Sequence, residues 1–353
     1  GGVAMKRVNL LLIYLLVGAM LSACGPSQEE ALPQEGIRVE ADGSGDYSTL
    51  EEALEEVPEE AIIILGPGTY HLERGLDLSK PLRLVGAGMD RTEIVSEAEG
   101  YVLRFSGDGP FAVADITFRH GGEMAADVVV VQGGGVAFAR CRFTGAVRAE
   151  TEEVRAGLRF QGSTAGVMQD CVAEGNDSFG VVVEGQAQPV LEGNLCRENT
   201  RSGILYSDSG AGVARQNECT DNGYHGISVN DQAEPTLEEN VCADNEQTGI
   251  VYFESTGGVA RGNECTGNGV GIGVGEQAAP TLEENVCTGN GQAGIAYLGS
   301  EGGVARQNEC SRNKGYGIYI GERSRPTLEE NECSGNTKYG IHVVGQAQPT
   351  LEG

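Results

Sequence analysis

The sequence predicts an all-β protein, a right-handed parallel β-helix with coils of about 23 residues. Gly accounts for 55 of 353 residues, which disfavours a helix-rich fold because interior Gly weakens helices. Cysteines recur at intervals of 22 or 23 residues in the second half. Each repeat holds three short apolar segments separated by turns, and none can bury its apolar face alone. Stacked coils would form three parallel sheets around one narrow core, and parallel crossovers favour the right-handed sense.

The first segment is typical of an export signal. Lys6 and Arg7 precede an apolar stretch of 14 residues, Val8–Leu21, which is too short to span a bilayer comfortably. It ends in Leu-Ser-Ala-Cys24, which resembles the lipobox of bacterial lipoproteins. The resemblance implies cleavage before Cys24 and lipidation of its thiol. We therefore predict a lipoprotein signal peptide over residues 1–23 and a flexible tether over the polar residues 24–36.

Residues 41–72 predict a short capping helix and then the first strand, Ile62–Leu65. Ser48 and Glu51 have the spacing of a capping box, and Pro58 would end the helix. The helix would cover the open end of the solenoid, which is otherwise a bare sheet edge. Its apolar face would consist of Leu50, Ala53, Leu54 and Val57.

The second half keeps a strict register. The repeating cysteines are Cys196, Cys219, Cys242, Cys265, Cys287, Cys310 and Cys333, each with an Asn two places before it and another three places after it. A Gly-Ile pair follows in each repeat. We predict that the Asn side chains lie at turns, where Asn tolerates left-handed φ, and bond to their stacked neighbours. We predict that the Cys side chains are small core residues, since stacked strands are too far apart for an easy disulfide; a ladder of thiols binding a soft metal is the alternative.

Two further sets of residues stack as columns, where a column is one position of successive coils. An inward column should alternate large and small side chains, from Leu191 and Ala214 to Leu328. The neighbouring outward column alternates in charge, so opposite charges should pair and fix the register. Its members are Glu192, Arg215, Glu238, Arg261, Glu283, Arg306 and Glu329.

We expect residues 37–353 to form a single β-helix domain. Its coils should be less regular over residues 37–165 and regular over residues 166–353. The sequence stops in mid-coil with no capping element, so we expect it to be truncated at the C-terminus.

Several motifs resemble a known superfamily. Residues 41–72 resemble the N-terminal cap of pectin methylesterases and of the wider pectate-lyase-like superfamily, and Ala114–Gly122 and Arg140–Gly145 extend the similarity. The regular repeats are similar to the CASH or NosD-like repeats of bacterial surface proteins. The resemblance implies a right-handed β-helix, but the esterase's Gln-Asp-Thr-Leu segment is missing after Gly145.

Asp115, Arg119 and His120 are weak candidates for a catalytic acid/base group. The simpler interpretation of Asp-Ile-Thr-Phe is a strand with Asp at its turn. The least regular stretch, Ala146–Val172, is the other place to look for an active site.

One outward column carries acids in four consecutive coils. Asp208, Asp231, Glu254 and Glu276 follow the Gly of successive Gly-Ile pairs by five residues, and the column continues with Gly299 and Glu322. Stacked carboxylates repel one another. Either they extend into solvent, or they share a cation or line a sugar-binding groove, with Tyr316, Tyr319 and Tyr339 as nearby stacking faces. Ca²⁺ is the ion expected there, since it prefers oxygen ligands, and no cofactor is otherwise required.

Two functions fit the sequence. The first is a cell-envelope lipoprotein whose β-helix is a non-catalytic surface for carbohydrate or a cell-surface protein. The alternative is a polysaccharide lyase or carbohydrate esterase acting on uronate-containing polymers. Missing catalytic motifs favour the first.

We expect a monomer, lipid-anchored in the bacterial cell envelope at the outer membrane or outer cell surface. The formal net charge of −28 excludes a nucleic-acid partner, and contact with the membrane should be through the lipid anchor alone.

Overall fold

The computed structural model describes residues 35–151, 153–254, 256–300 and 302–352. The predicted signal peptide, Cys24 and most of the predicted tether lie outside the described residues. Within those ranges no helix is both long and apolar enough to cross a membrane.

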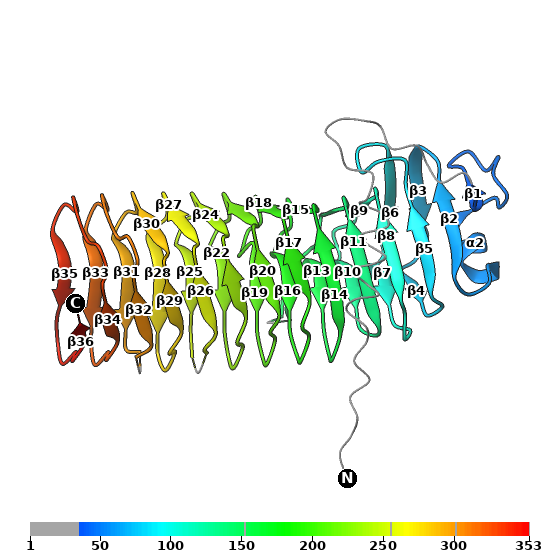
Figure 1. The fold of residues 1–353 in the computed structure, drawn as a ribbon. Coiled ribbons are helices and arrows are strands. Elements are labelled where there is room, and N and C mark those ends of the chain that lie inside the picture. Colours follow the sequence, from blue (N-terminus) through cyan, green and yellow to red (C-terminus); the bar gives the residue numbers. More distant parts are fainter. Residues whose placement is uncertain (1–34, 152, 255, 301, 353) are drawn as a thin grey trace, which may run out of the picture.

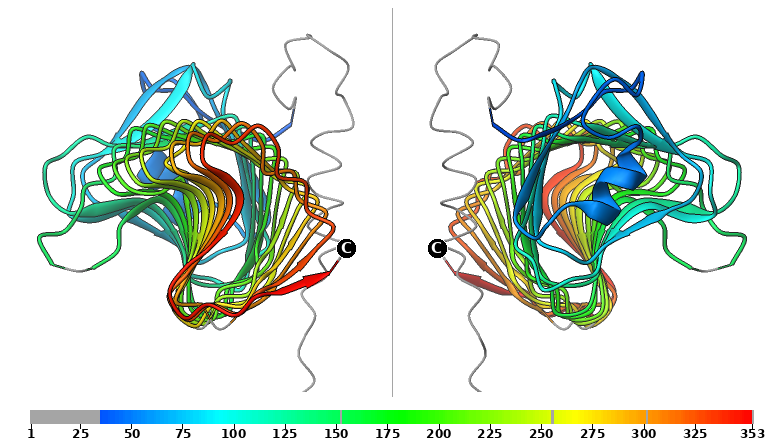
Figure 2. Two further views of the ribbon diagram at one scale, coloured as in Figure 1. Left: turned by 90° about the vertical axis from the view of Figure 1, so that its left-hand side faces the viewer. Right: turned by 90° about the vertical axis from the view of Figure 1, so that its right-hand side faces the viewer.

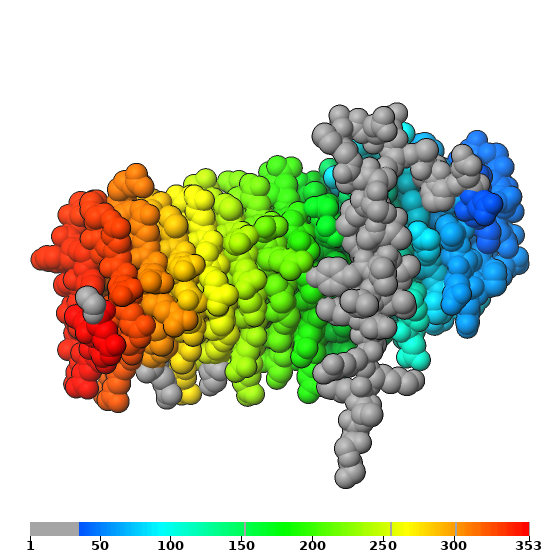
Figure 3. Space-filling view, viewed as in Figure 1, coloured from blue at the N-terminus to red at the C-terminus, as the bar shows by residue number. Residues whose placement is uncertain are grey.

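The described chain winds into a straight rod of stacked coils (Figures 1 and 3). The coils supply strands to three parallel sheets, called here sheets A, B and C, and the last coils join sheet B only through isolated bridges. Ladder partners are a full coil apart, as in Ile204 opposite Ile227 and Cys196 opposite Cys219. One hydrophobic core runs from Val39 to Leu328. The predicted fold, an all-β parallel β-helix with coils of about 23 residues, is therefore confirmed.

Sheet A has 14 strands in sequence order. They are β1 (Ile37–Val39), β2 (Ala61–Leu65), β5 (Leu82–Val85), β8 (Phe111–Ala114), β11 (Gly135–Ala139), β14 (Ala165–Gln169), β17 (Val190–Glu192), β20 (Val213–Arg215), β23 (Thr236–Glu238), β26 (Val259–Arg261), β29 (Thr281–Glu283), β32 (Val304–Arg306), β34 (Thr327–Glu329) and β36 (Thr350–Glu352). Its repeat strands carry the predicted alternating charges. Arg215 bonds Glu192 at 2.7 Å, and Glu283 bonds both Arg261 and Arg306 at 3.0 Å.

Sheet B has ten strands. They are β3 (Gly68–Leu72), β6 (Thr92–Ser96), β9 (Thr117–His120), β12 (Arg142–Thr144), β15 (Val172–Glu174), β18 (Leu195–Arg197), β21 (Glu218–Thr220), β24 (Val241–Ala243), β27 (Glu264–Thr266) and β30 (Val286–Thr288). The repeating cysteines from Cys196 to Cys287 lie on the inner side of this sheet, and they and Cys310 are fully buried.

Sheet C has 12 strands. They are β4 (Leu76–Leu78), β7 (Gly100–Phe105), β10 (Ala126–Val131), β13 (Ala156–Phe160), β16 (Phe179–Val183), β19 (Ile204–Tyr206), β22 (His225–Val229), β25 (Thr248–Tyr252), β28 (Val270–Gly275), β31 (Ala293–Leu298), β33 (Tyr316–Gly321) and β35 (Tyr339–Val343). Viewed along the rod, the backbone of the coils bends inward on one side (Figure 2).

The Gly of each Gly-Ile pair explains the inward bend of sheet C. A Cβ added to Gly226 would lie 2.9 Å from the Cβ of Cys242, so Gly226 faces the core, and Ile227, which follows it, is buried in the core too. Two successive inward positions bend the strand and bring its backbone against sheet B. Only Gly fits, since a side chain would collide with the Cys column.

The capping helix forms, with two differences from the prediction. Helix α2 (Leu50–Glu56) is capped by Thr49, whose side chain accepts from the amide of Glu52 at 3.1 Å. The predicted capping box at Ser48 and Glu51 is therefore wrong by one residue. Val57 is extended because Pro58 follows it.

The first strand also precedes the helix rather than following it. Strand β1 pairs in parallel with β2, so the chain forms a sheet edge, crosses the end of the rod as α2, and re-enters at Ala61. Leu50, Ala53 and Leu54 of α2 are buried against the first coils, and the helix lies across this end of the rod (Figure 2).

The Asn side chains form two buried ladders. The Nδ2 group of Asn240 donates to the carbonyl of Ala214 and to Oδ1 of Asn263, each at 2.9 Å. Its own Oδ1 accepts from the amide of Asn217 at 3.1 Å and from that residue's Nδ2 at 2.9 Å. The predicted stacking of Asn is confirmed, but left-handed φ belongs instead to the residue before each Asn, such as Glu239 at 53°.

Candidate functional site

The structure does not bring Asp115, Arg119 and His120 together as an acid/base group. Asp115 lies at the turn after β8 with φ of 63°, and its carboxylate accepts two bonds of 2.8 Å from Arg140. Arg119 donates to Glu93 at 2.6 and 3.3 Å, a pair that lowers the pKa of Glu93. Both charged groups are therefore held in separate ion pairs between coils.

His120 is buried, with 3% of its surface exposed, and its Nε2 lies 3.2 Å from the carbonyl oxygen of Ala98. Burial lowers its pKa, so the imidazole is neutral near pH 7. Because no bond links it to Asp115 or Arg119, the geometry supports the simpler interpretation of this segment as a strand.

A buried ionic network that the sequence reasoning missed lies beside the irregular stretch. The carboxylate of Asp127, with 2% of its surface exposed, accepts from the amide of Ala156 at 2.7 Å, from Arg155 at 3.1 Å and from Arg159 at 3.3 Å. Arg159 also bonds Glu184 at 2.6 Å. Burial raises the pKa of Asp127 against the pull of the two guanidinium groups. The spacing between these residues follows no repeat, so no periodic signal marks them.

This network holds the segment before β13 against the outer face of sheet C. Val154 packs on a small apolar cluster formed by Ala156, Phe179, Val182 and Leu205. Arg159 also donates to the carbonyl of Val154 at 3.0 Å. Every described charge in the network has a partner, so its evident role is to position this segment.

The acidic column is a column of turns. Asp208, Asp231, Glu254, Glu276 and Glu322 all have left-handed φ, between 51° and 61°. The glycines at the same place, Gly185, Gly299 and Gly345, have φ of 69° to 73°, which explains why Gly substitutes for an acid.

Two side chains of the acidic column bond to the backbone of the preceding coil. The carboxylate of Asp208 accepts from the amide of Gly185 at 3.1 Å, and that of Asp231 from the amide of Asp208 at 2.9 Å. The pKa of Glu254 is raised, first by its hydrogen bond with the Asp231 side chain. Among the described residues, no group of three or more His, Cys, Asp or Glu is placed to hold a metal ion. The backbone bonds account for these turns without Ca²⁺, and the calcium prediction stays untested.

The outer face of sheet C carries the other distinctive side chains. Since Gly226 and Ile227 both face the core, His225 and Ser228 on either side of them lie on the outer face. The hydroxyl of Ser228 lies 2.9 Å from that of Ser202 in the preceding coil. The ring of His225 lies 6.0 Å from that of Tyr224 and 6.2 Å from that of Phe253.

Two aromatic rings on this face lie against bare backbone. A Cβ added to Gly275 would be 3.1 Å from the Phe253 ring, and one added to Gly321 would be 2.9 Å from the Tyr319 ring. Phe253 is 38% exposed, and Leu298, in a coil between them, is 49% exposed. We call Phe253, Leu298 and Tyr319 the apolar strip. Phe253 and Leu298 directly precede two members of the acidic column, Glu254 and Gly299. Comparing the residues just before each member of that column would have revealed both from the sequence.

The predicted tyrosines gather at the far end of the strip. Tyr316 lies 5.3 Å from Tyr319, and its ring stacks at 4.8 Å on His342, which in turn stacks on Tyr339 at 5.0 Å. The structure thus brings Tyr316, Tyr319 and Tyr339 together. The rings of Tyr316, His342 and Tyr339 are nearly parallel, and Tyr339 keeps 57% of its surface exposed.

The Cys column is part of the core. The described cysteines have free thiols, and Cys196 to Cys310 are fully buried. Contact with neighbouring thiols and burial raise the pKa of Cys242 and Cys287, so these thiols are protonated. Cys171 lies outside this column: it takes the place of an Asn, and its amide donates to Oδ1 of Asn194 at 3.0 Å.

Solved structures share this architecture at low sequence identity. The A-module of the mannuronan C-5 epimerase AlgE4 from Azotobacter vinelandii has 19% identity and a TM-score of 0.67 over 83% of this chain and 91% of that one. The Dettilon tailspike protein has 14% identity and a TM-score of 0.71 over 86% and 68%. An α-1,3-glucanase catalytic unit from Streptomyces thermodiastaticus has 11% identity and a TM-score of 0.62 over 93% and 69%.

At such identities these structures establish the fold alone. No curated protein matches the sequence. A family model described as the right handed beta helix region matches residues 126–285 and 254–353, which is more than half of the chain. With its parallel sheets and stacked coils, the chain belongs to the right-handed β-helix family.

Proposed function

We propose that this protein is a cell-envelope lipoprotein whose β-helix binds polysaccharide, without catalysis, through the outer face of sheet C. The apolar strip of Phe253, Leu298 and Tyr319 is the observation that carries this proposal. Leu298 and Tyr319 lie on strands β31 and β33, Phe253 directly follows β25, and the three residues come from within four consecutive coils.

The strip suits sugars because their C–H faces pack on aromatic rings. Gly275 and Gly321 let the rings of Phe253 and Tyr319 lie on the backbone, so their conformations are fixed before a ligand arrives. Binding to such a surface loses little side-chain entropy. The carboxylates next to the strip can accept hydrogen bonds from sugar hydroxyls.

Carbohydrate chemistry in similar structures supports this assignment. One is named a mannuronan epimerase and another an α-1,3-glucanase, so the same solenoid serves proteins that act on polysaccharides. The absence of catalysis is supported by the separate ion pairs of Asp115 and Arg119 and by the partnered network around Asp127.

The binding experiment uses affinity electrophoresis of the mature chain through gels that contain single polysaccharides. Phe253→Ala and Tyr319→Ala should each reduce retardation several-fold, because each removes one stacking face. Val286→Ala is the matched control, since it truncates a 36% exposed apolar side chain on sheet B. Equal retardation of all four proteins, or release of new reducing ends or unsaturated products, would contradict the proposal.

The envelope location depends on Cys24, which lies outside the described residues. Metabolic labelling with a palmitate analogue should mark the wild-type chain and leave Cys24→Ser unlabelled. Labelling of both proteins, or of neither, would contradict lipidation at Cys24.

A further inference from the structure

The apolar strip is bordered by carboxylates along its whole length. In the chain, Phe253 is followed directly by Glu254, and the glycines that the two rings contact, Gly275 and Gly321, are followed by Glu276 and Glu322. The carboxylate of Glu322 also reaches back over Gly299, where a Cβ would lie 2.7 Å from its Oε2. Gly299, the position between Glu276 and Glu322 that lacks an acid, is therefore covered by the carboxylate of Glu322 from the following coil.

These carboxylates are already close enough to affect one another. The pKa of Glu254 is raised by its hydrogen bond to Asp231 and by the charge of Asp231, and Glu276 adds to the effect. A further negative charge close to any of them would be repelled even in water. Sugar hydroxyls, in contrast, can donate to the unused carboxylate lone pairs.

The opposite border offers few positive charges to offset this repulsion. Lys314 and Lys338 precede β33 and β35, at the end of the strip away from Phe253. The ammonium group of Lys338 lies 5.0 Å from the centre of the Tyr316 ring. Beside Phe253 itself, the described charged side chains at the ends of its strand and the next are acidic, Glu246, Glu254 and Glu276.

Two buried polar atoms lie near Phe253 without a hydrogen-bond partner. His225, beside Phe253, is 9% exposed, and its Nδ1 has no hydrogen-bond partner. Burial lowers its pKa to about 4, so the imidazole is neutral near pH 7 and adds no positive charge. Oδ1 of Asn230, in the same coil, also lacks a partner. Both atoms are buried from solvent, so they do not belong to the surface that a ligand contacts.

We propose that the polysaccharide bound on this face is uncharged and lies parallel to the rod, with its hydroxyls donating to Glu254 and Glu276. This inference rests on the proposed function and defines its ligand class. Phe253 and Tyr319 are three coils apart, about 14 Å at the usual strand spacing. The ligand must therefore be an extended oligosaccharide of at least three sugars to contact both rings.

The test compares hexasaccharides of one length by isothermal titration in EDTA. Cellohexaose and laminarihexaose are the neutral probes, and hexagalacturonate is the charged probe. At least one neutral probe should bind the wild-type chain at least tenfold more tightly than hexagalacturonate.

The double variant Glu254→Gln/Glu276→Gln should lower this preference at least threefold, because it removes the two charges beside Phe253. Glu218→Gln/Glu264→Gln is the matched control, since it removes two charges from the exposed surface of sheet B and changes the net charge equally. The control should keep the wild-type preference.

Tighter binding of hexagalacturonate than of both neutral probes, in EDTA or only after Ca²⁺ is added, would overturn this inference and leave the proposed polysaccharide binding intact. An unchanged preference in the Glu254→Gln/Glu276→Gln variant would overturn it as well. No binding by any polysaccharide, in gels or in titration, would overturn the proposed function itself.

Discussion

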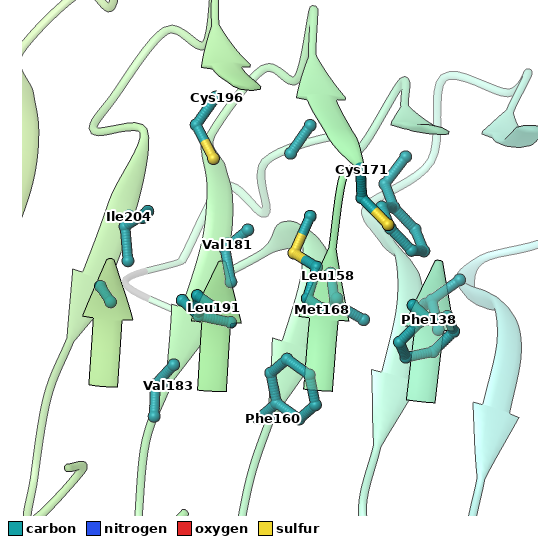
Figure 4. Close-up of a cluster of buried hydrophobic side chains, with 14 of the residues drawn as sticks. Phe138, Leu158, Phe160, Met168, Cys171, Val181, Val183, Leu191, Cys196 and Ile204 are labelled. Atoms are coloured by element: carbon teal, nitrogen blue, oxygen red, sulfur yellow. The ribbon is translucent and has the colours of Figure 1, made fainter. Parts of the chain in front are cut away.

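The N-terminal coils, residues 37–165, and the repeat coils from residue 166 onward fill the same three-sided rod in different ways. The N-terminal core is aromatic, with six fully buried Phe side chains: Phe105, Phe111, Phe118, Phe138, Phe143 and Phe160. Several meet edge to face, as Phe138 does with Phe143 at 5.3 Å. The repeat coils add buried Cys and Asn columns, and their buried rings are those of Tyr206, Tyr252 and Tyr297, in alternate coils. Figure 4 shows this change, from the rings of Phe138 and Phe160 to the smaller Val183, Cys196 and Ile204.

The comparison shows two ways to stabilise a solenoid. The repeat coils use identical buried hydrogen bonds in every turn, so each coil depends on its neighbours. The N-terminal coils use large apolar side chains and individual ion pairs, which tolerate insertions such as the segment before β13. The regular core leaves the outer face of sheet C free to vary, and the apolar strip lies there.

Breaking the ionic network should be the most damaging change in the N-terminal coils. Asp127→Ala leaves the amide of Ala156 and two buried guanidinium groups without their carboxylate. We expect a loss of about 4 to 5 kcal/mol in the free energy of unfolding, measured by urea denaturation. The exposed Asp108→Ala should lose almost nothing. A loss below that of Asn240→Ala would show that the network matters less than the ladder.

Breaking the Asn ladder should be nearly as damaging in the repeat coils. Asn240→Ala orphans partners in the two flanking coils, including the carbonyl of Ala214 and the amide of Asn217. We expect a loss of about 3 to 4 kcal/mol by urea denaturation. Its exposed neighbour Glu239→Ala is the control. Equal stability of the two variants would mean that buried water replaces the lost amide.

Acid should destabilise the repeat coils through His225. Its pKa falls from 6.5 to about 4 on folding, so the unfolded chain binds more protons between these pH values, and stability falls as the pH falls. The full effect is about 3 kcal/mol. His225→Gln should lack this component, so the wild type should lose more stability than the variant between pH 6.5 and 4. Parallel pH profiles of the two proteins would contradict it.

Adding one methyl group should reveal how closely sheets B and C approach. In Gly249→Ala the new Cβ would lie 2.7 Å from the carbonyl of Gly271 and 3.1 Å from the Cβ of Cys265. We expect a loss of about 2 kcal/mol by thermal or urea unfolding. Gly257→Ala meets only the end of the Glu234 side chain, at 3.4 Å, and should be nearly neutral. A neutral Gly249→Ala would mean that sheet C can move outward.

The smallest effect should come from the alternating charges on sheet A. Arg261→Ala removes an exposed partner of Glu283, which keeps its bond to Arg306. We expect no change in stability beyond experimental error, since solvent screens exposed pairs. A clear loss in the urea midpoint would show that this column supports the fold as well as the register.

Much of the fold could be predicted because a repeat makes its contacts periodic. The stacking of Cys196 on Cys219, the Asn ladder and the alternating Glu and Arg residues all follow once like positions lie above one another. The capping box was misplaced by one residue because Ser48 and Thr49 are both suitable caps, and only the backbone at Thr49 decides between them. Strand β1 was missed because three residues carry too weak a pattern.

The candidate site was less predictable, since its contacts follow no period. Asp115 and Arg119 are close in sequence, yet each pairs with a residue about a coil away. The rings of Phe253 and Tyr319 matter because of the glycines beneath them, and that relation depends on side-chain direction.

By itself, the sequence determined the period, the parallel register and the residues that stack, because a repeated unit can bury its apolar face only against its own copies. The tertiary structure alone decided the inward bend of sheet C, the partners of the charged side chains and the place of the apolar strip. These depend on distances of a few ångströms between residues a full coil apart, and such distances are set by how closely the sheets pack rather than by spacing along the chain.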